Sequence, residues 1–365
     1  MRRLDALRRE WDAHGLTHFV LAPGAGMRYL TGLALPGAER LTLFGAARDG
    51  RLALLLPELE AAALEQAGDG LRAAAIATYG DAEGPDGAVR RFGEALGIGA
   101  GSVVGVEGAS LRFFEAAALH AFSARLIAAD SILAALRMRK DEREAAAIER
   151  AAAILDAALD GMLPLLRAGM TEREVAAELD YRTRRLGSAG APFSTIVGAG
   201  PRGALPHSEP SDRRIENGDL VVLDFGAAVD GYAADTTRTI AFGEPSARAA
   251  RVYGVVRAAQ AAGVAACGPG VRLCDIDRAV RSLIEQAGFG PHFTHRTGHG
   301  LGLSVHEPPS VVAGETMPAA PGMVFTVEPG VYLEGEFGVR IEDDVLITET
   351  GARVLTKFPR DLIAL

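Results

Sequence analysis

Short apolar runs alternate with stretches of helical periodicity in the first third of the chain, and this alternation predicts an α/β domain. Apolar positions recur at helical spacing over residues 2–14, and Pro57 opens a second helix through Ala67. Apolar runs bounded by turn residues predict the strands, which are residues 17–21, 41–47, 52–56, 73–77, 103–106 and 126–128. We identify no catalytic constellation within these elements.

The pattern changes near residue 130, where an Ala-rich and charged helical region follows over residues 138–166. Asp141 is the predicted N-cap of this helix, because its side chain can accept from the first free backbone N–H groups. We therefore divide the chain into an α/β domain, residues 1–130, and a second domain, residues 131–365.

The second domain contains an internal repeat. A helix that opens after Gly169 ends at Gly187, and a helix that opens after Gly270 ends at Gly288, with the same spacing. Thr171 and Glu174 form a capping box on the first copy. A long helix precedes each copy and strand-like segments follow it, which predicts two related α/β halves with a site between them.

Composition narrows the function classes. A net charge of −9 argues against nucleic-acid binding, which needs a basic face. The charged N-terminus does not resemble a signal peptide, and no run of 18 apolar residues predicts a membrane span. The two cysteines, Cys267 and Cys274, are too few for a disulfide framework, so we expect a reducing, cytoplasmic location.

Two acids interrupt apolar strands in the second domain. Asp224 ends the run Leu-Val-Val-Leu, and Asp235 follows the turn Asp230-Gly231, which predicts a hairpin that carries both acids. A lone carboxylate among Val and Leu is costly unless it is paired or binds a metal. Single strand acids are more often surface residues, but two acids on paired strands can converge on one cation.

Three further residues extend the pattern. His299 has glycine on both sides, and Glu328 and Glu342 each end an apolar strand. Four carboxylates and one imidazole suit Mn²⁺, Co²⁺, Zn²⁺ or Fe²⁺. Bridging carboxylates can hold two such ions about 3.5–4 Å apart with water between them. The five residues in this order therefore predict a two-metal site.

The order of these five residues resembles the pita-bread metallopeptidases, the group of methionine aminopeptidase, aminopeptidase P and prolidase. Two segments look like its Xaa-Pro branch: Gly-Pro-Arg-Gly-Ala-Leu-Pro-His207-Ser and His295-Arg-Thr-Gly-His299-Gly-Leu-Gly-Leu-Ser-Val-His306-Glu-Pro. The resemblance covers essentially the whole chain. It implies a creatinase/prolidase-type N-terminal α/β domain and an α+β pita-bread catalytic domain with a pseudo-twofold internal repeat.

The resemblance also implies roles for the ligands. Asp224 is expected to chelate one ion, Asp235 and Glu342 to bridge both, and His299 to bind the ion opposite Asp224. Glu328 should bind a metal and carry the proton of the attacking hydroxide. The implied cofactors are two divalent ions per subunit, with Mn²⁺ favoured over Co²⁺, Zn²⁺ or Fe²⁺.

The resemblance assigns the substrate side of the site as well. His207 and His306 match histidines that contact the substrate and stabilise the tetrahedral intermediate, and His295 matches a histidine near the proline pocket. Arg340 matches an arginine that supports Glu342 or the substrate. Without the resemblance, a structural role for each of these residues stays open, and for Tyr232 packing competes with a hydrogen bond near the metals.

The expected function is hydrolysis of Xaa-Pro dipeptides by a metal-bridging hydroxide, in a homodimer that takes short proline-containing peptides. One departure leaves an alternative open: several relatives carry an Arg shortly after the residue that matches His306, and this chain has none before Pro321. The substrate carboxylate would then meet His295, His207 or an arginine elsewhere in the chain, such as Arg202. The alternatives are an Xaa-Pro aminopeptidase for longer peptides, a non-peptidase enzyme, and a catalytically silent binding protein.

Two further motifs invite a functional interpretation. Residues 198–203 match G-x-G-x-x-G, but Pro201 and Pro206 argue against the helix that a dinucleotide site requires, so we expect a loop that presents His207. The pair Glu39-Arg40 lies in a Gly/Pro-containing loop. It could limit substrate length in a dimer, or it could be a solvated charged turn.

Overall fold

A computed structural model describes residues 2–66, 71 and 73–365. The chain forms two compact units, Met1–Arg137 and Met138–Leu365. The predicted boundary at 130/131 lies at the start of helix α5 (Asp130–Met138), seven residues before the division between the two units, which falls at the end of this helix.

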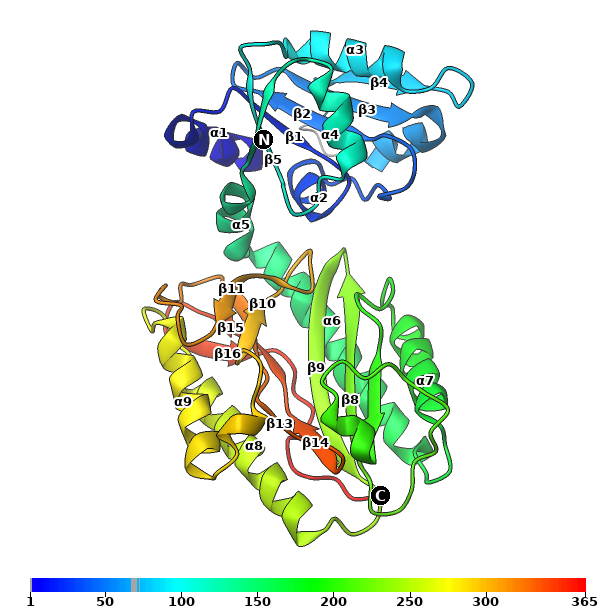
Figure 1. Cartoon of the computed structure of the whole chain (residues 1–365), viewed down its shortest axis with the longest axis vertical. Helices are drawn as coiled ribbons and strands as arrows, with labels where there is room; N and C mark the ends of the chain where they lie inside the picture. Colours follow the sequence, from blue (N-terminus) through cyan, green and yellow to red (C-terminus); the bar gives the residue numbers. More distant parts are fainter. Residues whose placement is uncertain (1, 67–70, 72) are drawn as a thin grey trace. The chain divides into compact units, whose positions relative to one another are not determined.

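The N-terminal unit is built on a six-stranded sheet in the order β4-β3-β2-β1-β5-β6 (Figure 1). Strand β2 runs antiparallel to both of its neighbours, and the other adjacent pairs are parallel. The strands are β1 (His18–Leu21), β2 (Leu43–Ala47), β3 (Leu52–Pro57), β4 (Ala75–Tyr79), β5 (Val103–Val106) and β6 (Arg125–Ala128).

Helices cover both faces of this sheet. Residues of α1 (Arg2–His14), α2 (Ala25–Thr31) and α5 pack in one apolar cluster, and residues of α3 (Asp86–Leu96) and α4 (Phe113–His120) pack in another. The predicted α/β domain is thereby confirmed. The predicted helix after Pro57 is wrong in type, because the structure has the 3₁₀ segment η1 (Glu58–Gln66) there; Ala67 lies outside the described residues.

The C-terminal unit contains three antiparallel sheets. Their orders are β7-β8-β9, β11-β10-β12-β15-β16 and β13-β14. The strands are β7 (Ile196–Ala199), β8 (Leu220–Val229), β9 (Tyr232–Ala241), β10 (Gly298–Gly300), β11 (Glu307–Val311), β12 (Val324–Val327), β13 (Gly330–Leu333), β14 (Phe337–Arg340), β15 (Asp343–Ile347) and β16 (Ala352–Val354).

Two pairs of helices flank these strands, α6 and α7 beside one half and α8 and α9 beside the other (Figure 1). The helices and 3₁₀ segments are α6 (Glu142–Met162), η3 (Leu163–Leu165), α7 (Glu172–Arg185), η4 (Gly200–Ala204), α8 (Ala247–Ala266), α9 (Leu273–Gln286) and η5 (Gly290–His292). Each half has its own apolar core, one centred on α6 and β8 and one on α8, α9 and β12.

The backbone confirms the predicted internal repeat. Gly169 N–H donates to Ile215 O at 2.8 Å, and Gly270 N–H donates to Ala319 O at the same distance. Both glycines have a positive φ, 90° and 84°, which residues with a side chain rarely adopt. In each half, the same turn therefore precedes the second helix. The glycine of this turn donates a hydrogen bond to the segment that follows the helix.

The start of the long helix in the first half differs from the sequence prediction. Helix α6 begins at Glu142 rather than at residue 138, although Asp141 is its N-cap and forms a capping box with Glu144. The reason is a tertiary contact: Lys140 N–H donates to Gly322 O at 2.8 Å, and Arg139 forms a bridge with Met323. This pairing holds residues 139–140 in an extended conformation, so these residues cannot be part of the helix.

Several smaller predictions concern the surface and the thiols. Cys267 and Cys274 are both free cysteines. In the described part of the chain, no helix has the length and apolar character that crossing a bilayer requires. In the loop 39–40, Arg40 contacts Asp81 through two hydrogen bonds and Glu39 through a third, all at the surface.

Candidate metal centre and substrate cavity

The hairpin of β8 and β9 carries the first two predicted ligands. Asp230 and Gly231 both have positive φ angles, 53° and 86°, as a two-residue type I′ turn requires. In the resulting register Asp235 lies opposite Gly226, two residues beyond Asp224 on β8. The two acids are therefore diagonal neighbours on one face of the hairpin, and both are buried, with 8% and 5% exposure.

Strand β10 presents the histidine ligand. A Cβ atom at Gly298 would lie 1.8 Å from Thr326 O, and one at Gly300 would lie 2.3 Å from Pro308 O. Glycine on both sides of His299 is thus required by the close approach of β11 and β12. The Thr326 hydroxyl accepts from His299 N–H at 3.1 Å and donates to Glu328 Oε1 at 3.2 Å, which ties the two predicted ligands together.

Glu342 comes from the segment between β14 and β15 and is 1% exposed. Its backbone N–H donates to Thr237 O, and the Thr237 hydroxyl donates to Glu342 Oε2 at 2.6 Å. Thr237 pairs with Asp224 in the β8–β9 register. The second half of the domain is therefore joined to the hairpin directly beside the first acid.

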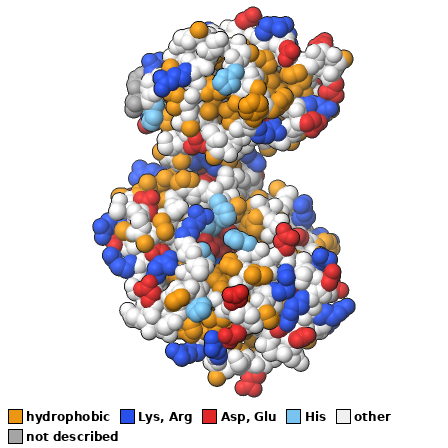
Figure 2. Space-filling view, viewed as in Figure 1, with side chains coloured by type: hydrophobic (Ala, Val, Ile, Leu, Met, Phe, Trp, Pro, Cys, Tyr) orange, Lys and Arg blue, Asp and Glu red, His pale blue; other side chains and the backbone are white. Residues whose placement is uncertain are grey.

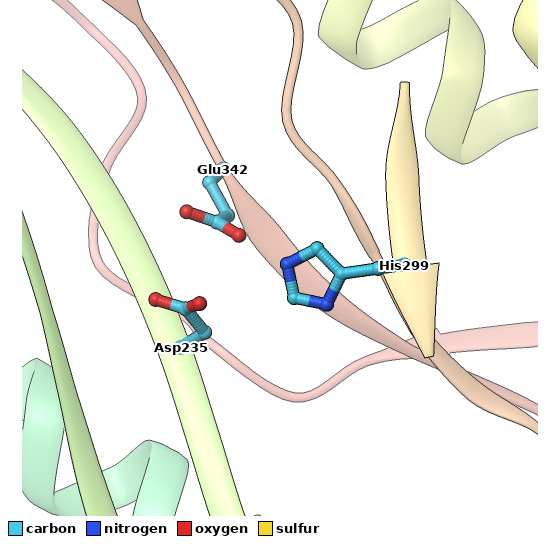
Figure 3. A group of neighbouring side chains, drawn as sticks. All are labelled: Asp235, His299 and Glu342. Atoms are coloured by element: carbon cyan, nitrogen blue, oxygen red, sulfur yellow. The ribbon is translucent and has the colours of Figure 1, made fainter. Parts of the chain in front are cut away.

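Asp235, His299 and Glu342 each offer a ligand atom within 4.8 Å of the others, and their side chains converge in Figure 3. Across the described residues, Asp224 Oδ1, Asp235 Oδ1 and Glu342 Oε1 have no hydrogen-bond donor although they are buried. Such oxygens are costly unless a cation binds them. The donor set therefore fits divalent metal ions. Glu328 lies 3.3 Å from His299 Nε2.

Burial and mutual repulsion shift the ionisation of these ligands. Burial, then the neighbouring carboxylates, raise the pKa of Asp235 and of Glu342 well above the ordinary range. Burial raises the pKa of Glu328 to about 7, and burial lowers the pKa of His299 to about 3. His299 is thus a neutral imidazole, the form that binds metals, while the carboxyls hold protons in the absence of cations.

These shifts predict that metal affinity rises with pH. Binding requires the carboxylates to lose their protons, so protons compete with the metal below the raised pKa values, most clearly below the value of about 7 for Glu328. We expect the Kd for Mn²⁺ to fall by about tenfold per pH unit for each proton released. Calorimetric titration of the metal-free protein between about pH 6 and pH 8, in buffers of different ionisation enthalpy, counts those protons.

The matched variant is Glu328→Gln, which keeps the shape but removes one titrating group. Its binding should release fewer protons below about pH 7 and should depend less steeply on pH. A Kd for Mn²⁺ that is independent of pH in the unmodified protein would contradict the assignment of protons to the candidate carboxyl ligands in the metal-free state.

The ligands line one cavity of about 440 Å³, a size suited to a small peptide. Figure 2 shows histidine side chains around a hollow with carboxylates inside it. The cavity is lined by Phe193, Ser194, Thr195, Ile196, Pro206, His207, Ser208, Glu209, Pro210, Asp224, Asp235, His295, Arg296, His299, His306, Glu328, Tyr332, Arg340 and Glu342. All five predicted ligands and the three predicted substrate histidines are among them.

The three histidines occupy different settings. His207 and His306 are exposed at the cavity, and the ring of His306 stands edge-on to His299 at 4.2 Å between centroids. His295 is partly buried and contacts Phe293 edge-on at 5.1 Å and Tyr332 at 5.5 Å. Of these three rings, those of His295 and Tyr332 line the cavity, while Phe293 is buried in the core. The two lining rings form an aromatic wall that is suited to a compact hydrophobic ring.

Arg340 organises this region. Its Nη2 donates to Asp224 Oδ2 at 2.5 Å, its Nη1 to the Tyr332 hydroxyl at 2.8 Å, and its Nε to the Thr237 hydroxyl at 3.1 Å. Support for Glu342 runs through Thr237 rather than through a direct hydrogen bond. Nη1 also reaches Pro206 O at 3.4 Å, beside His207.

Tyr232 does not line the cavity, which corrects its prediction as a substrate-binding residue. Its hydroxyl donates to Glu144 Oε1 at 2.6 Å, and its ring packs with the core around α6. The physical reason is strand alternation: Asp235 is the third residue after Tyr232, and this odd offset makes the two side chains point to opposite faces of β9. The tyrosine at the site is Tyr332, whose hydroxyl contacts Arg340 and His295.

Sequence reasoning missed Phe193, Arg296 and Tyr332 as cavity residues. Arg296 stands between His295 and Thr297 in a segment already assigned to the site, which was an available signal. Tyr332 follows Glu328-Pro-Gly on the short strand β13, but nothing local shows which face that strand presents. The glycine motif at 198–203 spans the end of strand β7 and the 3₁₀ segment η4 and does not begin an α-helix, as expected for a loop leading to His207.

Both parts of the chain match known protein families. The profile of metallopeptidase family M24 matches residues 146–349, and that of the creatinase/prolidase N-terminal domain matches residues 3–139. A Mycobacterium tuberculosis protein named "Probable dipeptidase PepE" is 38% identical over 363 residues, which cover 99% of this chain and 96% of that protein.

Two archaeal proteins extend the comparison. The Xaa-Pro dipeptidase of Pyrococcus furiosus is 42% identical over 234 residues, covering 64% of this chain and 67% of that protein. The crystal structure of a dipeptidase from Pyrococcus horikoshii superposes with a TM-score of 0.93 at 36% identity, covering all of both chains. The predicted two-domain fold is thereby confirmed.

Proposed function

The chain belongs to metallopeptidase family M24, and on this premise we propose that it is a dipeptidase that hydrolyses Xaa-Pro dipeptides. The observation that carries the proposal is one cavity that holds both the five candidate ligands and an aromatic wall around His295. The dipeptidase names of its relatives support the same substrate class.

We assign the metal positions to Asp224, Asp235, His299, Glu328 and Glu342, with Mn²⁺ as the preferred ion over Co²⁺, Zn²⁺ or Fe²⁺. The unpartnered buried oxygens of three of these acids support the assignment. Two divalent ions, when bound, would activate a water molecule and polarise the scissile carbonyl. The remaining chemistry falls to side chains of the cavity.

Glu328 is the proposed proton carrier. Its carboxylate can take a proton from the attacking water and return it to the leaving group. The proton's destination is the proline nitrogen, which becomes the amine of the leaving product. The Thr326 hydroxyl, at 3.2 Å from Glu328 Oε1, orients the carboxyl for both transfers.

The histidines at the cavity take the substrate roles. His306 and His207 would donate hydrogen bonds to the developing oxyanion or to the leaving nitrogen. The pyrrolidine ring of proline would pack against the wall of His295 and Tyr332. Arg340 is a positioning residue, since its guanidinium fixes both Asp224 and the Tyr332 hydroxyl. We also propose that the protein is a homodimer and that it is located in the cytoplasm.

The deciding experiment is a substrate panel. Metal-free protein is reconstituted with Mn²⁺, Co²⁺, Zn²⁺ or Fe²⁺ and assayed on Ala-Pro, Ala-Pro-Ala and Ala-Ala. We expect Ala-Pro to be cleaved fastest, with Mn²⁺ giving the highest kcat/KM. Because the cavity wall is apolar and aromatic, Ala-Ala should lose affinity through the missing ring contact.

Each other result points to a specific alternative. Comparable cleavage of Ala-Pro-Ala would favour an Xaa-Pro aminopeptidase, and cleavage of Ala-Ala without Ala-Pro would refute the proline assignment. No hydrolysis with any metal, together with no bound metal, would favour a catalytically silent binding protein.

A further inference from the structure

Two guanidinium groups reach the cavity, and only one of them is neutralised. Arg340 is paired with Asp224 at 2.5 Å. Arg296 donates from Nη1 to the Ser310 hydroxyl at 3.3 Å, and no carboxylate of the described residues forms an ion pair with it. An arginine keeps its positive charge at any physiological pH. The cavity therefore contains a guanidinium that forms no ion pair with a described residue.

Arg296 lines the same cavity as the candidate metal ligands. That cavity, of about 440 Å³, is bounded by Arg296, by His306 and by all five candidate ligands. A dipeptide that occupies it can therefore contact Arg296 and the candidate metal positions together.

The other cationic groups near the cavity are already engaged. Arg202 donates to Glu172 Oε2 at 2.8 Å and to the Ser208 hydroxyl at 3.1 Å, and it does not line the cavity. Both ring nitrogens of His295 have partners, Arg296 O at 2.8 Å and the Tyr332 hydroxyl at 2.9 Å. Among the described lining residues, Arg296 alone offers a guanidinium to an anionic ligand.

We propose that Arg296 binds the C-terminal carboxylate of the dipeptide substrate and thereby restricts the enzyme to short substrates. The inference rests on the proposed dipeptidase function. The sequence led us to expect such an arginine shortly after His306, where Ser310 stands. Gly298 pairs with Val311 and His299 with Ser310 in the β10–β11 register, so the side chain of Arg296 supplies a guanidinium at Ser310 from the neighbouring segment.

This position explains discrimination by length. A planar guanidinium can bind a carboxylate through two parallel N–H···O hydrogen bonds. In a tripeptide, the additional residue would move the terminal carboxylate by about 3.5 Å along the peptide. In a dipeptide amide, the group that faces Arg296 would carry no charge. Dipeptides with a free C-terminal carboxylate are therefore favoured over tripeptides and over dipeptide amides.

The test compares Ala-Pro with its amide, Ala-Pro-NH₂, in the metal-loaded full-length protein and in Arg296→Met. The unmodified enzyme should prefer the free acid, and the variant should lose about 10- to 100-fold of that preference. The loss should appear chiefly in KM for Ala-Pro, with kcat/KM for the amide nearly unchanged. Arg296→Glu should reverse the preference, because it places a negative charge opposite the carboxylate.

The preference is a ratio of two kcat/KM values, so partial misfolding or metal loss in a variant cancels from it. Arg353→Met is the charge-matched control, because Arg353 is exposed and pairs with Glu149 away from the cavity; its ratio should equal that of the unmodified protein. A ratio that stays within about twofold in Arg296→Met would overturn the inference.

The comparison also separates this inference from the proposed function. If the unmodified protein prefers a dipeptide without proline, the same acid and amide pair is made from that dipeptide. The proline assignment then fails while Arg296 is still tested. Conversely, cleavage of Ala-Pro with an unchanged ratio in Arg296→Met would reject Arg296 and leave the dipeptidase assignment standing.

Discussion

Asp235→Asn should abolish metal-dependent hydrolysis, with kcat/KM falling by at least about 10³-fold. The substitution keeps the shape of the side chain but removes the charge from the group that Asp235 forms with His299 and Glu342. Because the ions would supply several kcal/mol of transition-state stabilisation, losing one candidate ligand should remove most of it. Kinetics on Ala-Pro and metal analysis of the same samples are the measurements.

The fold should survive this substitution. In the metal-free protein, burial and the neighbouring carboxyls favour the neutral form of Asp235, so a neutral amide should leave the stability of the metal-free state unchanged or raise it. The control is Asp212→Asn, an exposed acid paired with Arg173, which should retain full activity and metal content. Two bound ions and normal turnover in Asp235→Asn would remove Asp235 from the metal site.

The fold and the ligand set could largely be predicted from the sequence, because their signals are local. An acid at the end of an apolar run, a histidine between glycines and a capping box at Thr171 each show in a few neighbouring residues. The two halves repeat these local signals. Asp224 lies nine residues after Ile215, and Glu328 lies nine residues after Ala319, the two acceptors of the equivalent turn hydrogen bonds.

What could not be predicted depends on contacts between distant segments. The sequence pattern predicts a helix at residues 139–140, but in the structure these residues pair with residues 322–323 and are extended. Tyr332 joins the site through Arg340 and His295, which only the folded β13–β14 hairpin brings together. Tyr232 is a different case, since strand alternation alone places it on the face opposite Asp235, and a stricter use of that rule would have excluded it.

Interactions behind the ligands were equally invisible in the sequence. Asp344 Oδ2 accepts from Asp235 N–H at 3.0 Å, and Asp343 binds Arg238, Gln260 and Arg360 in the interior. These contacts hold the segment after Glu342 against the strand that carries Asp235. The spacing of the ligands therefore depends on a buried polar network, whose members lie more than 80 residues apart in some pairs.

Arg340→Met should cost about 3–5 kcal/mol of folding free energy in the metal-free protein. Arg340 is 4% exposed, and its guanidinium is the counter-charge for Asp224 and a donor to the Tyr332 hydroxyl. Methionine preserves much of the side-chain length but leaves Asp224 buried without its partner. The resulting penalty is that of an uncompensated buried charge, which exceeds the net value of the original pair.

Urea unfolding followed by circular dichroism measures this loss. Trp11 is the sole tryptophan and lies in the N-terminal unit, so its fluorescence reports on that unit separately. The control is Arg248→Met, which breaks the exposed pair with Glu336 and should cost no more than about 1 kcal/mol. If Arg340→Met were as mild as this control, Arg340 could not be the residue that compensates Asp224. If the loss is as large as expected, the first ligand depends on Arg340 to exist as a buried carboxylate before any metal binds.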